Sequence, residues 1–204
     1  MRLILSYAKL GPMAFISHLD FQQLWWRIFR LAGISIQLTQ GYNPRPKMRF
    51  ASPLATSFQG ERELLEVFLD EEEQNVEGRL NAVMPQGLKV LASTPVPQDF
   101  PKVTALVDAL AYRVLLPHPL DSLESIAREA GDYLLSAKLA GQELNMLIKV
   151  ENQRTLRPDN LAGISFPGFN AVGFPVTRTG IYARQNSRIS PVPAGLFLLP
   201  CQPT

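Results

Sequence analysis

Alternating apolar and polar positions open the chain and then give way to a helical pattern. The range Arg2–Lys9 alternates with a period of two, which is typical of a strand. From Ser17, an N-cap residue, the spacing predicts a helix that runs to about Ala32 and stops at Gly33. The buried stripe of this helix should contain the apolar residues at helical spacing, which are Phe21, Leu24, Trp25, Ile28 and Ala32.

Further strands and a second helix complete a recognisable order of elements over residues 1–94. Strands are predicted at Ser35–Thr39, resuming at Met48–Ala51, then at Glu63–Leu69 and from Leu88 to Ser93. Asp70 should cap a helix from Glu71 to about Met84, with acids at its positive end. The order β-α-β-β-α-β is that of a ferredoxin-like α+β sandwich.

The second half of the chain is less regular. Residues 95–104 are rich in proline and predict a stiff linker. Beyond it, residues 105–204 should form a smaller, incomplete ferredoxin-like α+β unit with an irregular, proline-rich tail from Pro191. Its elements are predicted as strands at Ala111–Leu116, Leu144–Val150 and Gly180–Arg184 and a helix from Leu120 to about Lys138, with a Gly/Pro-interrupted segment at Asp159–Pro175.

Composition narrows the class of protein. Apolar residues make up 46% of the 204 and charged residues 19%, as in ordinary globular proteins. The single cysteine, Cys201, excludes an intrachain disulfide and a thiolate metal cluster, and no apolar run is long enough for a membrane span. We therefore expect a cytoplasmic protein with no membrane attachment and no bound cofactor.

The charges are segregated along the chain, although the net charge is only +2. Residues 1–50 contain seven lysines and arginines against one acid, whereas residues 60–82 contain eight acids against two arginines. Such a chain can present a basic face while remaining near neutral overall, unless the two blocks mix in space.

The most informative segment is the proline loop, Gly41–Arg49. Two prolines exclude a helix and stiffen a strip in which three cations recur at every second position. Fixed cations beside an aromatic and an amide suit phosphate or carboxylate recognition, with nucleic acid the commonest such ligand. The candidate binding residues are Tyr42, Asn43, Arg45, Lys47 and Arg49. The alternative is a solvated loop that only joins two elements.

Catalytic motifs are scarce. The sequence has no metalloprotease, nucleotide-binding or serine-hydrolase motif. His18, in the first turn of the first helix, is the one candidate general acid or base, and a histidine bonded to backbone is its structural alternative. His118, between two prolines, is expected to be an exposed bystander. Trp25 should pack in the core, whereas packing and base stacking both stay open for Trp26, about 100° from the stripe.

The string Lys9-x-Gly11, then Phe15–Asp20, Gly41–Lys47 and Phe50-Ala51 resembles an uncharacterised bacterial family described as radical-SAM-linked. The resemblance covers about the first seventy residues and returns weakly around Arg157 and Arg178. It implies a cytoplasmic partner of a radical SAM protein in RNA modification or metabolism.

Three functions follow for testing. The first is a non-catalytic accessory module that binds RNA or another anion through the proline loop. The second is a metal-free RNA-processing enzyme with His18 as general base and Arg45 or Lys47 stabilising charge on phosphate. The third is an adaptor that docks the radical SAM partner through the acidic helix and an apolar sheet edge.

Overall fold

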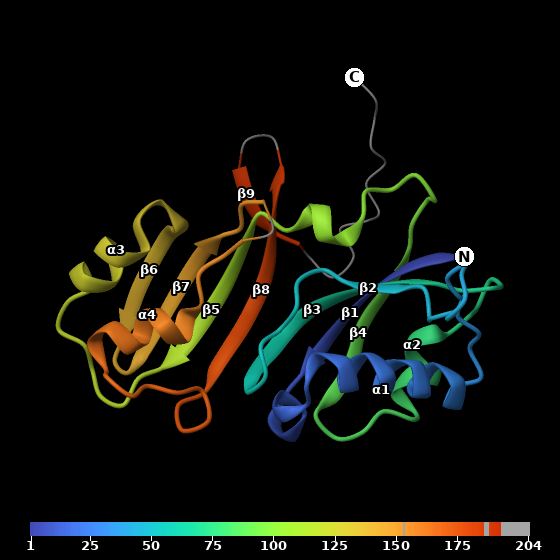
Figure 1. Ribbon diagram of the computed structural model, residues 1–204, viewed down its shortest axis with the longest axis horizontal. Helices are drawn as coiled ribbons and strands as arrows, with labels where there is room; N and C mark the ends of the chain where they lie inside the picture. The colour runs from blue at the N-terminus through green and yellow to red at the C-terminus, as the bar shows by residue number, and fades with distance from the viewer. Residues whose placement is uncertain (153, 186–187, 193–204) are drawn as a thin grey trace.

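A computed structural model describes residues 1–152, 154–185 and 188–192. The chain is a mixed α+β protein built on one open sheet, with strand order β4-β1-β3-β8-β5-β7-β6; β2 pairs with β3, and β9 with β8 (Figure 1). The pairing of β3 with β8 is parallel and joins the two halves, while every other strand pair of the described residues is antiparallel.

The first half contributes one end of the sheet and two helices. Strand β1 is central, between β4 and β3, and β2 is short because it follows the proline loop. The elements in order are β1 (Arg2–Lys9), the 3-10 turn η1 (Gly11–Phe15), α1 (His18–Leu31), β2 (Met48–Phe50), β3 (Phe58–Phe68), α2 (Val76–Asn81) and β4 (Leu88–Pro95).

The second half repeats the same order of strands and helices. After η2 (Val103–Leu106) come β5 (Ala109–Leu115), α3 (Glu124–Ala130), η3 (Gly131–Tyr133), β6 (Leu134–Ala140), β7 (Glu143–Lys149), α4 (Pro158–Ser165), β8 (Val176–Gln185) and β9 (Arg188–Pro191). The unit expected to be incomplete therefore contains both helices and four principal strands.

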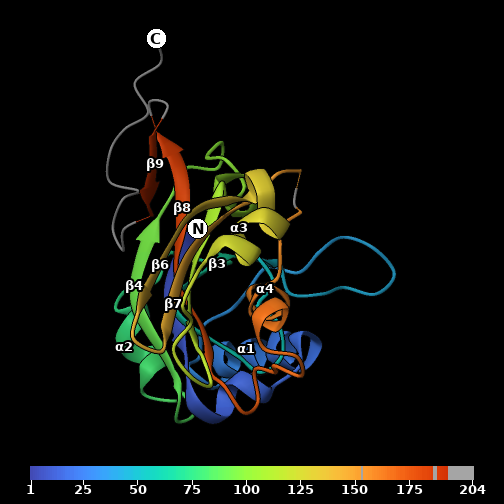
Figure 2. The same ribbon diagram turned by 90° about the vertical axis from the view of Figure 1, so that its left-hand side faces the viewer.

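The helices of both halves lie on the same side of the sheet (Figures 1 and 2). Two apolar clusters result, one beneath α1 and α2 and one centred on β5, β7 and α4. Between the two pairs of helices, β3 pairs directly with β8, and the short 3-10 helix η2 contacts both strands. This junction is where charged residues are buried.

Helix α1 confirms the sequence pattern closely. The Ser17 hydroxyl accepts a hydrogen bond from the Asp20 N–H, as its N-cap position requires. Trp25 and Ile28 of the stripe are fully buried, and Leu24 lies partly buried against the same cluster. Phe29, which lies outside the predicted stripe, is also fully buried.

Two predictions for the first half were wrong in detail. Residues 35–39 form isolated bridges at Ile36 and Leu38 rather than a strand. The second helix begins at Val76, after Asn75 in a left-handed conformation, and not at Glu71. The acids at 71–73 therefore lie in a loop, where Glu73 pairs with Arg79, and they do not face a helix N-terminus.

The second half departs further from the prediction. The helix expected to reach Lys138 ends at Ala130, because Gly131 takes a positive φ of 51° and the chain then enters β6. Helix α4 lies where only an interrupted segment was expected. The tail beyond residue 192, including Cys201, lies outside the described residues.

The proline-rich linker is held against the first half. The guanidinium of Arg2, which is 3% exposed, donates hydrogen bonds to the carbonyls of Pro97, Gln98, Phe100 and Pro101. The linker therefore packs beside β1. Over the described residues, no helix is long and apolar enough to cross a membrane.

Candidate functional site

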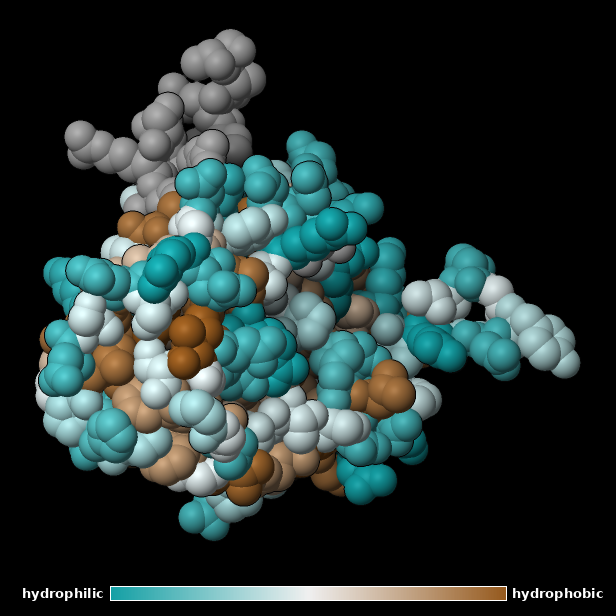
Figure 3. All heavy atoms as spheres, turned by 60° about the vertical axis from the view of Figure 1, so that its left-hand side comes forward, coloured by the Kyte–Doolittle hydropathy of each residue, from teal (hydrophilic) through white to brown (hydrophobic). Residues whose placement is uncertain are grey.

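Two short, paired chain segments form the base of the proline loop, where it leaves the body of the protein. Leu38 bridges to Pro46, the Thr39 N–H donates to the Arg45 carbonyl at 2.8 Å, and the Arg45 N–H donates to the Thr39 hydroxyl. Between α1 and β2 the loop projects into solvent, as the light-blue segment of Figure 2 and the hydrophilic arm of Figure 3 show. The backbone of the loop is therefore anchored while its tip is free of packing.

The tip carries three of the predicted residues. Tyr42 is 100% exposed, and Asn43 and Arg45 are exposed as well. Arg45 makes no salt bridge within the described residues. These side chains contribute nothing to the core and are available to a ligand.

Lys47 directly precedes β2 and Arg49 lies on it, and both side chains are more constrained. The Lys47 ammonium lies 4.1 Å from the centre of the Phe68 ring, a cation–π contact. Arg49 pairs with Glu66, which is fully buried and also accepts from Arg2 Nε at 2.7 Å. Arg49 therefore neutralises a buried carboxylate and is not a free cation of the strip.

His18 does not share a site with these cations. Its ring lies 5.3 Å from that of Phe50, which packs in the cluster beneath α1. Neighbouring side chains of a strand point to opposite faces, so Lys47 and Arg49 point away from Phe50 and His18. The structure thus separates the candidate acid–base residue from the anion strip.

The environment of His18 favours its neutral form. Burial, with a smaller contribution from Lys9, lowers the pKa of His18 below its ordinary value. The Gln22 side-chain amide lies 2.9 Å from Nε2 of the ring. A neutral imidazole can act as a base, but no metal-ligating partner accompanies it: the described residues contain no group of three His, Cys, Asp or Glu that could hold a metal ion.

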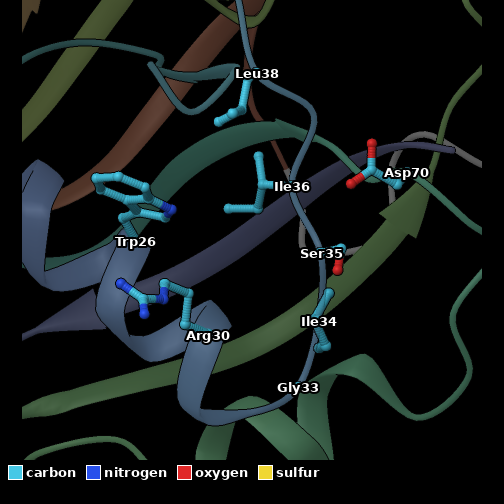
Figure 4. Close-up of a pocket in the computed structure, with 8 residues that line it drawn as sticks. All are labelled: Trp26, Arg30, Gly33, Ile34, Ser35, Ile36, Leu38 and Asp70. Carbon is cyan, nitrogen blue, oxygen red and sulfur yellow. The ribbon is translucent and has the colours of Figure 1, made fainter. Parts of the chain in front are cut away.

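A pocket of about 650 Å³ lies beside the base of the loop. Trp26 and Arg30 project from α1, and Ile36 and Leu38 approach them from the segment that leads into the loop (Figure 4). Ser35 and Asp70 lie further along the same pocket, together with Gly33 and Ile34. Trp26 is 39% exposed and Leu38 49% exposed.

This pocket was missed as a unit, although Trp26 had been set apart from the buried stripe. The signal in the sequence was the position of Trp26 off that stripe, with Arg30 one helical turn later. Arg30 lies with its guanidinium carbon 6.0 Å from the Trp26 ring centre. Leu38 comes from another segment, and only the fold brings it opposite the tryptophan.

A second polar cluster lies at the junction between the halves. Arg178 of β8 and Glu63 of β3 form a two-pronged ion pair, and each residue is 1% exposed. Arg178 also donates to the Ser52 carbonyl at 2.8 Å. Nearby, Lys9 is 2% exposed and donates to the Ile16 carbonyl.

The pKa values at the junction follow from burial and from this pair. Burial opposes the charge on Arg178, but the Glu63 carboxylate and then Tyr112 raise its pKa above the ordinary value, so it stays charged. Burial raises the pKa of Tyr112 and lowers that of Lys9. The cluster is enclosed, and its hydrogen bonds are made within the protein, so it is a structural feature rather than an open site.

The fold and its projecting loop define an α+β protein with a single, mostly antiparallel sheet. Residues 2–158, more than half of the chain, match the family described as "Uncharacterized protein conserved in bacteria (DUF2344)". The chain belongs to this family. Among curated proteins, none matches the chain significantly.

Proposed function

We propose that the protein is a non-catalytic binding module for single-stranded RNA. The observation that carries this proposal is the adjacency of the projecting loop and the pocket at Leu38, which belongs to both. Together they offer exposed cations at Arg45, Lys47 and Arg30 and exposed aromatic rings at Tyr42 and Trp26. Proteins that bind single strands combine these two elements, because phosphates require cations and unpaired bases require stacking partners.

Charge distribution supports an anionic ligand. Helix α1 exposes Arg27 and Arg30, and the loop adds Arg45 and Lys47. Among the described residues, none of these four cations forms a salt bridge with an acid. A ligand that carries phosphates therefore meets unpaired cations on α1 and on the loop.

Binding of a labelled, single-stranded RNA tests the proposal. Replacing Arg45→Ala together with Lys47→Ala should weaken binding about 2- to 30-fold, the range for two exposed ionic contacts. Each phosphate contact on a single strand adds about 0.7 to the dependence of affinity on salt, so the slope should flatten by about 1.4. The matched control is Lys89→Ala with Arg128→Ala, two exposed cations elsewhere on the surface, which should change neither quantity as much.

The outcomes separate the rival functions. Equal effects of the two double variants would refute a loop-specific site, and no binding by the wild type at low salt would leave the adaptor function. For that function the acids would act from a loop, since they do not begin α2. RNA turnover that disappears in His18→Ala would favour the enzyme, for which the lowered pKa of His18 is the supporting observation.

We further propose that each half is a ferredoxin-like unit. In support, the first half places its strands in the order β4-β1-β3-β2 and the second half in the order β8-β5-β7-β6, with antiparallel neighbours in both. A radical SAM protein as partner and a cytoplasmic location rest on the sequence resemblance and remain proposals.

A further inference from the structure

We infer that the Trp26 pocket holds one unstacked base of the bound strand, with the Trp26 ring as its stacking surface. This inference rests on the proposed function and adds a base-binding site to the phosphate contacts of the loop. The class of ligand inferred for the pocket is a planar heterocyclic base with a phosphate group next to it.

The apolar walls fit a flat ring. Trp26 on α1 and Leu38 on the facing segment are both large, apolar and exposed, with Ile36 buried between them at the pocket floor. Trp26 is one of three exposed large apolar residues of α1, with Leu19 and Leu31, and it is the one of the three that lines this pocket. An aromatic face that is open on one side stacks on any base, since every base has a π-face.

A cation stands at the same site. Arg30 lies beside Trp26 on α1 and makes no salt bridge within the described residues. Its guanidinium is placed to contact the phosphate next to a base that stacks on the indole.

The facing segment offers unpaired backbone groups for the edge of the base. Its backbone hydrogen bonds to neighbouring segments are made by residues 35, 37 and 39. The Ser35 carbonyl accepts from the Asp70 N–H, and the Thr39 N–H donates to the Arg45 carbonyl. The Gln37 N–H donates to the Phe68 carbonyl, and the Gln37 carbonyl accepts from the Lys47 N–H. Over the described residues, the backbone N–H groups of Ile36 and Leu38 donate no hydrogen bond. Because both residues line the pocket, these two N–H groups are the candidate donors to the edge of a base.

The test compares a short oligoadenylate with an abasic ribose-phosphate strand that has the same number of phosphates. Wild-type protein should bind the oligoadenylate about 5- to 150-fold more tightly, the range for one stacked base. Trp26→Ala should remove most of this ratio and leave the affinity for the abasic strand unchanged. Trp26→Phe, which keeps an aromatic face, should retain most of it. Quenching of Trp26 fluorescence by the oligoadenylate is an independent readout, because Trp25 is fully buried.

Each outcome decides a different point. An unchanged ratio in Trp26→Ala would overturn the base pocket, and so would equal binding of both strands by the wild type; in either case the phosphate contacts of the loop, and with them the proposed function, would stand. Failure of the wild type to bind either strand would refute the proposed function and this inference together. Loss of the ratio in Arg45→Ala with Lys47→Ala, at unchanged affinity for the abasic strand, would also contradict the assignment of roles.

Discussion

Replacing Arg178→Met should destabilise the protein strongly, because it removes one partner of a buried ion pair. Arg178 donates from Nε to Glu63 at 2.8 Å and from its terminal nitrogens to Glu63 and to the carbonyls of Ser52 and Pro53. After the substitution, Glu63 stays buried at the junction without its bidentate ion-pair partner. Breaking a buried pair in this way costs about 3–5 kcal/mol of the free energy of unfolding.

A cost of that size is a large part of the total stability of a domain, about 5–15 kcal/mol. The matched control is Arg113→Met on β5, which breaks a pair with Glu61 in which each side chain is 38% exposed. An exposed pair contributes about 0–1 kcal/mol. The double variant Arg178→Met with Glu63→Leu should recover most of the loss, because an apolar pair needs no counter-charge.

Urea unfolding followed by tryptophan fluorescence measures these differences, since Trp25 lies in the core beneath α1. If Arg178→Met costs no more than Arg113→Met, the pair is hydrated and the junction is not closed as described. If the double variant is no more stable than Arg178→Met, the loss comes from the contacts to the Ser52 and Pro53 carbonyls rather than from the unpaired carboxylate.

Two further predictions concern pH and backbone strain. Because the folded state lowers the pKa of His18 below its ordinary 6.5, the unfolded chain binds this proton more readily. Stability should therefore fall as pH drops below about 6.5, less so in His18→Gln, and equal pH dependence of urea unfolding in the two proteins would contradict the burial of the ring. Gly87 has a φ of 88°, and a Cβ there would lie 2.3 Å from the Leu10 carbonyl oxygen. Gly87→Ala should cost about 1–3 kcal/mol in thermal unfolding, whereas Gly163→Ala, in open space on α4, should stabilise by about 0.5–1 kcal/mol; equal shifts in Tm would refute the strain.

The helices and strands that were predicted well are those whose secondary structure is determined by their own residues. Helix α1 has an N-cap serine, an amphipathic stripe and a glycine beyond its end, and β1 alternates between two buried faces. Local propensity and burial agree there, so the sequence pattern is sufficient.

The elements that were missed depend on distant partners. Strand β6 was read as the end of a helix, because its leucines and alanines suit either structure and the choice depends on pairing with β7. The acids after β3 also suit a helix start, yet the left-handed Asn75 begins α2 later. Both errors arise where a short segment has no pattern of its own.

The features of the candidate site likewise divide into those that the sequence alone predicts and those that depend on the fold. The proline loop was predictable, since prolines and cations at alternate positions specify a stiff exposed strip whatever surrounds it. The separation of His18 from Arg49 was not, because it depends on which face of β2 turns toward α1. The pocket at Trp26 also requires the fold, since Leu38 reaches it through the bridge to Pro46.

The residues that carry the family resemblance have two different physical roles in this arrangement. Lys9, Glu63 and Arg178 are buried at the junction, where the ion pair joins β3 to β8 and a change of residue disturbs folding. A buried pair adds little net stability over apolar packing, whereas loss of one partner leaves the other charge buried and unpaired. Tyr42 and Arg45 are exposed on a projecting loop and support no core. Folding gives no reason for an aromatic and a cation at those positions, whereas the proposed recognition of a phosphate-bearing strand does.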